Sequence, residues 1–126
     1  MKHEMKNLEG DWQASTGVLA GQPLPDDIVS STKLTIGTTL YEVNLAGVID
    51  RGTCLIDETA RPITMRIEGT QGPNAGKTIL AIVEFLAEDE IRIAYDLSGT
   101  QYPQTFAATD DPSNYVAALR RALDES

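Results

Sequence analysis

The chain has 126 residues, 41% of them hydrophobic and 23% charged, which predicts one globular domain over residues 1–126. Its 10 basic and 19 acidic residues give a net charge of −9, so we expect neither nucleic acid nor an anionic membrane as a partner. The longest apolar run, Ile79–Val83, is too short for a membrane span. A single cysteine forms no internal disulfide, and no apolar signal segment follows the first residues, so we expect a cytoplasmic protein.

Short blocks rich in Val, Ile and Thr recur along the chain between Gly, Pro, Asn and Asp residues, a pattern typical of strands joined by turns. In chain order these blocks are Asp11–Leu19, Lys33–Thr38, Leu40–Ala46, Gly52–Asp57, Ile63–Glu68, Lys77–Leu86 and Glu90–Leu97. Apolar and polar side chains alternate clearly in two of them, as in strands that bury one face. The short connections favour an antiparallel sheet whose strand order follows the sequence.

Two segments do not match a strand pattern so simply. Pro25–Val29 has a proline and two acids where the first turn of a helix accepts them, which predicts a short helical turn after the first strand. Residues 113–123 have apolar side chains at helical spacing, yet an eighth strand here would close a barrel. We favour the strand because closure removes an open sheet edge. The predicted fold class is all-β, an eight-stranded antiparallel up-and-down barrel.

Short motifs follow one another from about Leu8 to Arg121. They are Gly10-x-Trp12, Gly21-x-Pro23, Asp57 with Pro62, Gly72-Pro73-x-x-Gly76-Lys77-Thr78, Asp89-x-Ile91 and Pro103-x-x-Phe106. In this order they resemble a family of small bacterial domains with lipocalin-like (calycin-type) barrels and no assigned activity. The resemblance implies that Trp12 closes one end of the barrel. It also implies that a basic residue of the last strand, here Arg121, stacks on the indole ring.

Residues for common catalytic and metal sites are scarce. With His3 and Cys54 as the one histidine and the one cysteine, the chain cannot assemble a Cys-His dyad or a structural zinc set. Gly72–Thr78 is similar to a phosphate-binding loop, but it precedes an expected strand rather than a helix, so we interpret it as a hairpin loop. We therefore expect no enzymatic activity, no metal and no cofactor.

The candidate site consists of side chains that would face the barrel interior. Tyr41, Met65, Tyr95 and Phe106 could line a ligand cavity or simply fill the core, because an eight-stranded barrel is near the size that side chains alone can fill. Glu84 also has two interpretations. It lies outside the barrel if Phe85 faces inward, and otherwise it would anchor a ligand inside with Arg66 or Tyr95 as its partner.

These observations predict non-catalytic binding of a small, mainly apolar ligand inside the barrel. One alternative is a protein-interaction or structural module whose barrel is filled. A further alternative is an enzyme whose catalytic set is not recognisable in the sequence. A cavity would favour the first function, whereas a packed interior with an exposed apolar patch would favour the second.

Overall fold

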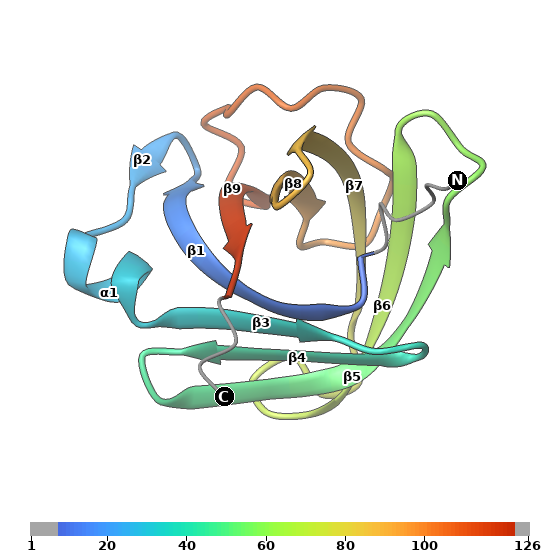
Figure 1. The fold of residues 1–126 in the computed structure, drawn as a ribbon, viewed down its shortest axis with the longest axis horizontal. Helices are drawn as coiled ribbons and strands as arrows, with labels where there is room; N and C mark the ends of the chain where they lie inside the picture. Colours follow the sequence, from blue (N-terminus) through green and yellow to red (C-terminus); the bar gives the residue numbers. More distant parts are fainter. Residues whose placement is uncertain (1–7, 123–126) are drawn as a thin grey trace.

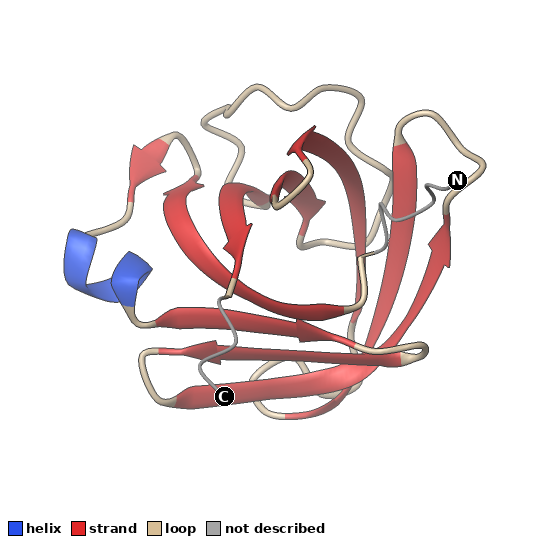
Figure 2. Ribbon diagram, viewed as in Figure 1, coloured by secondary structure: helices blue, strands red, loops and turns tan. Residues whose placement is uncertain are grey.

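A computed structural model describes residues 8–122, which form a closed antiparallel β-barrel (Figure 1). The elements are β1 (Gly10–Leu19), β2 (Gln22–Pro23), α1 (Asp26–Ser30), β3 (Thr32–Ile36), β4 (Leu40–Leu45), β5 (Val48–Asp57), β6 (Ile63–Gln71), β7 (Thr78–Ala87), β8 (Glu90–Asp96) and β9 (Asn114–Arg121). The barrel consists of β1 and β3 to β9 in sequence order, and β1 pairs with β9 to close it. The predicted all-β up-and-down barrel and the short helix after the first strand are confirmed (Figure 2).

The closing strand β9 resolves the ambiguous C-terminal segment. It pairs antiparallel with β1, from Trp12 opposite Arg121 to Leu19 opposite Tyr115, with a register shift between Ala14 and Thr16. The helical interpretation of this segment is thus wrong. Backbone hydrogen bonds to both β1 and β8 outweigh a helical spacing of apolar residues, because tertiary pairing overrides weak local propensity.

One end of the barrel is closed by Trp12, as the lipocalin-like resemblance implies. The Trp12 side chain is fully buried, and its indole N–H donates a hydrogen bond to the Leu8 carbonyl oxygen at 2.9 Å. The guanidinium carbon of Arg121 lies 4.3 Å from the ring centroid, a cation–π arrangement. Gly10 has φ +135, and a Cβ there would lie 2.7 Å from Arg121 Nη1, so the glycine makes room for the arginine. We call the end of the barrel that Trp12 closes the closed end.

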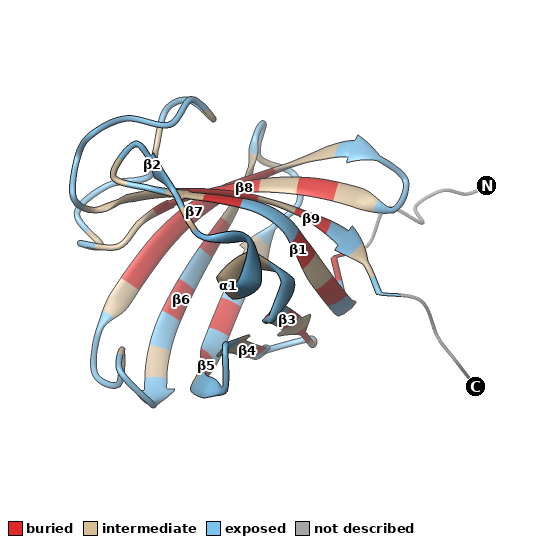
Figure 3. Cartoon of the chain, turned by 90° about the vertical axis from the view of Figure 1, so that its left-hand side faces the viewer, coloured by how far each residue is buried: buried red, intermediate tan, exposed pale blue. Residues whose placement is uncertain are grey.

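Side chains alternate between the interior and the outer wall along each strand, which Figure 3 shows as alternating buried and exposed segments on β5 and β6. Near the closed end the interior is filled by tightly packed apolar side chains, among them Trp12, Ile36, Met65, Ile91 and Ile93. This half of the barrel is a conventional hydrophobic core.

The long connection between β8 and β9, residues 97–113, folds back against the outer wall of the barrel and forms the orange arch of Figure 1. Phe106 of this loop packs on Ile82, Ala94 and Val116, which point outward from β7, β8 and β9. Because the loop covers it, β7 is buried on both faces over Ile79–Val83. This double burial explains the uninterrupted apolar run in the sequence.

The opposite end of the barrel, which we call the open end, is formed by the β4–β5 hairpin, the β6–β7 loop and α1. Strand β5 begins at Val48 rather than at Gly52 as predicted, and it follows a two-residue turn of Ala46 and Gly47. Both turn residues have positive φ, 53° and 94°, which is the geometry that suits the twist of a tight hairpin. The four additional residues bring Asp50 into the wall of the open end.

Candidate functional site

A cavity of about 300 Å³ occupies the barrel interior near the open end. Its deeper wall is made of apolar side chains from the strands, namely Ala14, Leu34, Val43, Ile79, Ala117 and Leu119. Leu24 and Ile28, on the segment that leads into and includes α1, line it from the side of the helix, which faces the viewer in Figure 3. The volume lies at the lower limit of about 300 Å³ that is usual for small-molecule sites.

The rim of this cavity is also apolar. Leu19, Leu45 and Val48 line the cavity and are more than one third exposed, with Val48 at 52%. Exposed large apolar side chains are common singly, but here three of them surround one opening. An apolar guest would cover these side chains as it enters and would remove them from water.

Three tyrosines, Tyr41, Tyr95 and Tyr115, line the cavity. The hydroxyl oxygens of Tyr41 and Tyr95 are 2.6 Å apart, and the Tyr95 ring stacks on Tyr115 with centroids separated by 5.4 Å. Burial raises the pKa of all three phenols, and for Tyr41 the neighbouring Tyr95 raises it further. These groups are therefore protonated at neutral pH. They serve as hydrogen-bonding and aromatic surfaces rather than as bases.

Asp50 is the one charged side chain in the cavity wall formed by residues 8–122. Its carboxylate accepts hydrogen bonds from the Asn74 backbone N–H at 3.1 Å and from the Asn74 side-chain amide. Gly72 lets the β6–β7 loop approach so closely, because its φ is +93 and a Cβ there would lie 2.3 Å from the Ile49 carbonyl oxygen. The loop that resembled a phosphate-binding motif is thus a hairpin connection that covers one side of the cavity.

The structure separates the predicted cavity residues into three groups. Tyr41 and Tyr95 line the cavity. Met65 faces inward but lies fully buried in the packed half of the barrel, outside the cavity wall.

The remaining three candidates, Arg66, Glu84 and Phe106, are on the outer wall, so their predicted place in a cavity is corrected. Arg66 pairs with Glu68 at 2.8 Å, and Glu84 pairs with Arg92 at 3.0 Å. Glu84 thus follows the alternative in which Phe85 faces inward. Phe106 packs on the outer wall beneath its own loop, because the outward-facing side chains of β7, β8 and β9 at this place are apolar.

Sequence reasoning missed Asp50, Asn74 and Tyr115 as cavity residues. Asp50 and Val48 alternate with outward-facing residues, so a longer β5 in the prediction would have placed Asp50 inside. Tyr115 would have followed from the strand interpretation of the C-terminal segment, since it lies opposite Tyr95 in the β8–β9 register. Asn74 reaches the cavity because of the conformation of the β6–β7 loop. A loop has no alternation of apolar and polar residues from which this conformation could be predicted.

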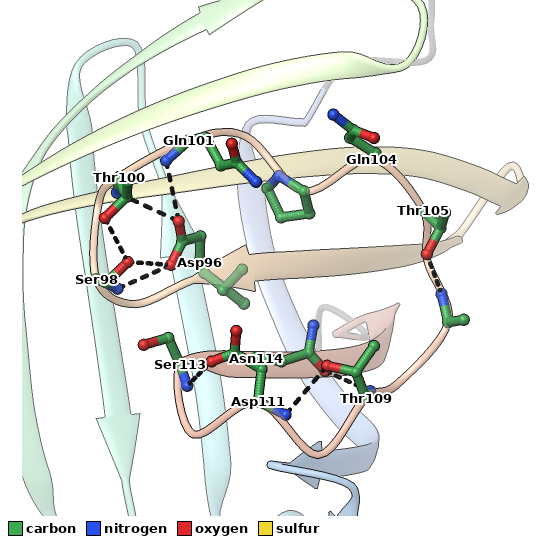
Figure 4. Close-up of a pocket in the computed structure, with 13 residues that line it drawn as sticks. Asp96, Ser98, Thr100, Gln101, Gln104, Thr105, Thr109, Asp111, Ser113 and Asn114 are labelled. Atoms are coloured by element: carbon green, nitrogen blue, oxygen red, sulfur yellow. Dashed lines mark hydrogen bonds between the residues drawn. The ribbon is translucent and has the colours of Figure 1, made fainter.

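A second hollow of about 530 Å³ lies beneath the β8–β9 loop, and most of the residues that line it have polar side chains (Figure 4). Both oxygens of the Asp96 carboxylate accept hydrogen bonds from this loop, including the Ser98 hydroxyl at 2.6 Å and the Gln101 N–H at 3.0 Å. Burial raises the pKa of Asp96, but these hydrogen bonds outweigh it and hold the pKa below its usual value. The polar groups here bind the loop to the barrel, so the hollow is a feature of the loop fold.

Cys54 is buried in the core, and burial raises the pKa of its thiol, which disfavours the reactive thiolate. Within residues 8–122, no group of three or more His, Cys, Asp and Glu side chains is placed to hold a metal ion. In the same part of the chain, no helix is long and apolar enough to cross a membrane.

Comparisons of the chain with protein-family models, with curated proteins and with solved structures find no match. The barrel agrees with the fold that the lipocalin-like resemblance implies, while membership of that family stays a prediction. The cavity at the open end is therefore the feature on which a functional proposal rests.

Proposed function

We propose that this chain is a lipocalin-like, non-catalytic binding protein that holds one small, mainly apolar ligand at the open end of its barrel. The observation that carries the proposal is the apolar cavity of about 300 Å³ inside an otherwise packed barrel. A filled interior would have had no place for such a guest. The cytoplasmic location stays part of the proposal, and with a net charge of −9 nucleic acid is not the expected ligand.

Burial of apolar surface provides the driving force. A guest that removes roughly 200 Å² of apolar surface from water gains about 5 kcal/mol at 25 cal/mol per Å², before the cost of association. The cavity is already present in the structure without a guest, which reduces that cost. The tyrosine pair at the cavity wall then orients the guest, since one phenol hydrogen remains after Tyr41 and Tyr95 have shared a hydrogen bond.

A pair of neighbouring alanines on β9 provides a matched test. Ala117 lines the cavity, whereas Ala118 is on the opposite face of the same strand. Ala117→Leu adds three carbons inside the cavity, and Ala118→Leu adds the same atoms outside it. Calorimetric titration with phenylbutanol, a neutral apolar probe, should show saturable one-to-one binding to the wild type and to Ala118→Leu.

Binding to Ala117→Leu should be at least ten-fold weaker, with a circular dichroism spectrum like that of the wild type. Absence of saturable binding to the wild type across phenylbutanol, an isoprenoid alcohol and an environment-sensitive dye would contradict the proposal. Equal weakening in both alanine variants would also contradict it, because binding would then depend on general stability rather than on the cavity.

A second function is supported by a specific surface feature. Leu40 and Leu55 project outward from the paired strands β4 and β5, and Leu55 is 71% exposed. An exposed apolar pair of this kind suits contact with another protein. If the cavity binds nothing, Leu55→Glu should abolish whatever association the purified protein shows in analytical ultracentrifugation. Arg120→Glu on β9, which is separated from β4 and β5 by other strands, should leave that association unchanged.

A further inference from the structure

The carboxylate of Asp50 distinguishes this cavity from a purely apolar one. Asp50 points inward from β5, opposite Val43 of β4, among side chains that are otherwise apolar or neutral. The cavity wall in residues 8–122 contains no lysine, arginine or histidine. A negative charge thus faces the guest without a positive charge beside it.

The hydrogen bonds of Asp50 leave part of its capacity unused. Asn74 supplies two donors, its backbone N–H and its side-chain amide, one to each carboxylate oxygen. An ionised carboxylate accepts at about four lone-pair positions, so roughly two remain. Among the ion pairs of residues 8–122, none includes Asp50. The Asn74 contacts hold the carboxylate in place but bring no positive charge to it.

The charge of Asp50 also acts on the interior of the cavity. The pKa of Tyr41 is raised mainly by burial and by Tyr95, and the Asp50 charge adds to the same effect. A positively charged guest would share the cavity with this carboxylate and with Tyr41, Tyr95 and Tyr115. Both the carboxylate and the negative face of an aromatic ring attract a cation.

We propose that the ligand of this cavity is an apolar amine, whose protonated nitrogen pairs with the free acceptor positions of Asp50 while its apolar body fills the space between Leu34, Ile79 and Leu119. This inference rests on the proposed binding function and adds the chemical class of the ligand. Fatty acids and other apolar carboxylates are excluded by the same charge, because their anionic group would face Asp50 with no cation to neutralise it.

Three probes with one apolar body test the inference. Phenylbutylamine, phenylbutanol and phenylbutanoate differ in the charge of one terminal group, and calorimetric titration at neutral pH compares their affinities. In the wild type the amine should bind about ten- to hundred-fold more tightly than the alcohol, the range expected for one charge-assisted hydrogen bond. The carboxylate should bind more weakly than the alcohol.

Two variants distinguish the effect of the Asp50 charge from the effect of the β6–β7 loop conformation. Asp50→Asn removes the charge but keeps an acceptor for the Asn74 backbone N–H, so the amine should lose its advantage while the alcohol binds as before. Asn74→Ala removes the side-chain contact and leaves the carboxylate, so the preference for the amine should persist. Circular dichroism and urea denaturation serve to check that both variants are folded.

The outcomes separate this inference from the proposed function. Alcohol binding without an advantage for the amine, or an advantage that survives in Asp50→Asn, overturns the role of Asp50 and leaves the apolar binding function intact. An advantage lost equally in Asn74→Ala overturns it as well, because loop geometry rather than charge would then select the ligand. Failure of all three probes contradicts the proposed function itself.

Discussion

Removal of the Trp12 side chain tests how the closed end supports the rest of the barrel. The indole is fully buried, its N–H donates to the Leu8 carbonyl oxygen at 2.9 Å, and the Arg121 guanidinium lies 4.3 Å from the ring centroid. Trp12→Ala would lose the burial of a large aromatic ring, this hydrogen bond and the cation–π contact together. It would also leave a void next to the packed side chains of the closed end.

The magnitude follows from these terms. Replacing a buried tryptophan with alanine typically costs about 3–5 kcal/mol, a range that includes both the lost transfer energy and the cavity. The cation–π contact contributes roughly 0.5–2 kcal/mol of that cost, depending on how far the pair is removed from water. We therefore expect the free energy of unfolding to fall by about 4 kcal/mol, which is a large share of the roughly 5–15 kcal/mol typical of a whole domain.

Urea denaturation followed by far-ultraviolet circular dichroism measures this loss, because Trp12 is the one tryptophan and the variant has no indole fluorescence. Trp12→Phe is the graded variant, with a smaller loss, and Leu55→Ala is the control. Leu55 is 71% exposed on the outer wall, so its truncation should change the free energy of unfolding by less than about 0.5 kcal/mol. A loss below about 1 kcal/mol for Trp12→Ala would refute the reasoning, since so small a value is incompatible with a buried, hydrogen-bonded indole.

Three further predictions concern the loops and the tyrosines. Gly72→Ala should destabilise more than Gly76→Ala in urea denaturation, because both have positive φ, 93° and 82°, but only Gly72 lies against a backbone carbonyl. The pKa of Asp96 is lowered in the folded protein, so its hydrogen bonds stabilise the fold fully at pH values above its unfolded pKa of about 3.9. The wild type should therefore be more stable than Asp96→Asn at neutral pH, and this difference should disappear as the pH falls through the folded pKa. Tyr41 and Tyr95 have raised pKa values in the folded protein, so their contribution to folding stability is complete below about pH 10 and declines at higher pH. Tyrosinate absorbance should show both side chains ionising only well above pH 10 in the folded protein. Equal losses in the glycine variants, a pH-independent advantage of Asp96, or titration of both tyrosines near pH 10 would each contradict the corresponding contact.

The barrel could be predicted from the sequence because its determinants are local and periodic. Alternation identified most strands, and the lipocalin-like resemblance, rather than periodicity, implied the pair of Trp12 and Arg121 at the closed end. The C-terminal segment was ambiguous because its apolar side chains suit either periodicity. Pairing with β1 and β8, which depends on the whole barrel, decides in favour of a strand.

The site was only partly predictable, because some of its residues lie outside the clearly periodic segments. Tyr41 and Tyr95 follow from alternation, but Asp50 lies between Gly47 and Gly52, before the predicted start of its strand at Gly52, so its inward direction was hidden. Phe106 was expected to line the cavity or to fill the core. In the structure it is half-buried on the outer wall, where a long loop covers β7 to β9.

The central claim is that a guest binds in the open half of the barrel interior, and methyl NMR spectra of the protein during titration with phenylbutanol test it most directly. Ile79 and Ile82 lie on opposite faces of β7, since Ile79 lines the cavity and Ile82 packs beneath Phe106 on the outer wall. The Ile79 methyl resonance should shift along a saturable one-to-one curve, while Ile82 and the closed-end residue Ile91 stay nearly constant. Saturable shifts at Ile82 with none at Ile79, or no saturable shift at any of the three, would contradict binding inside the barrel.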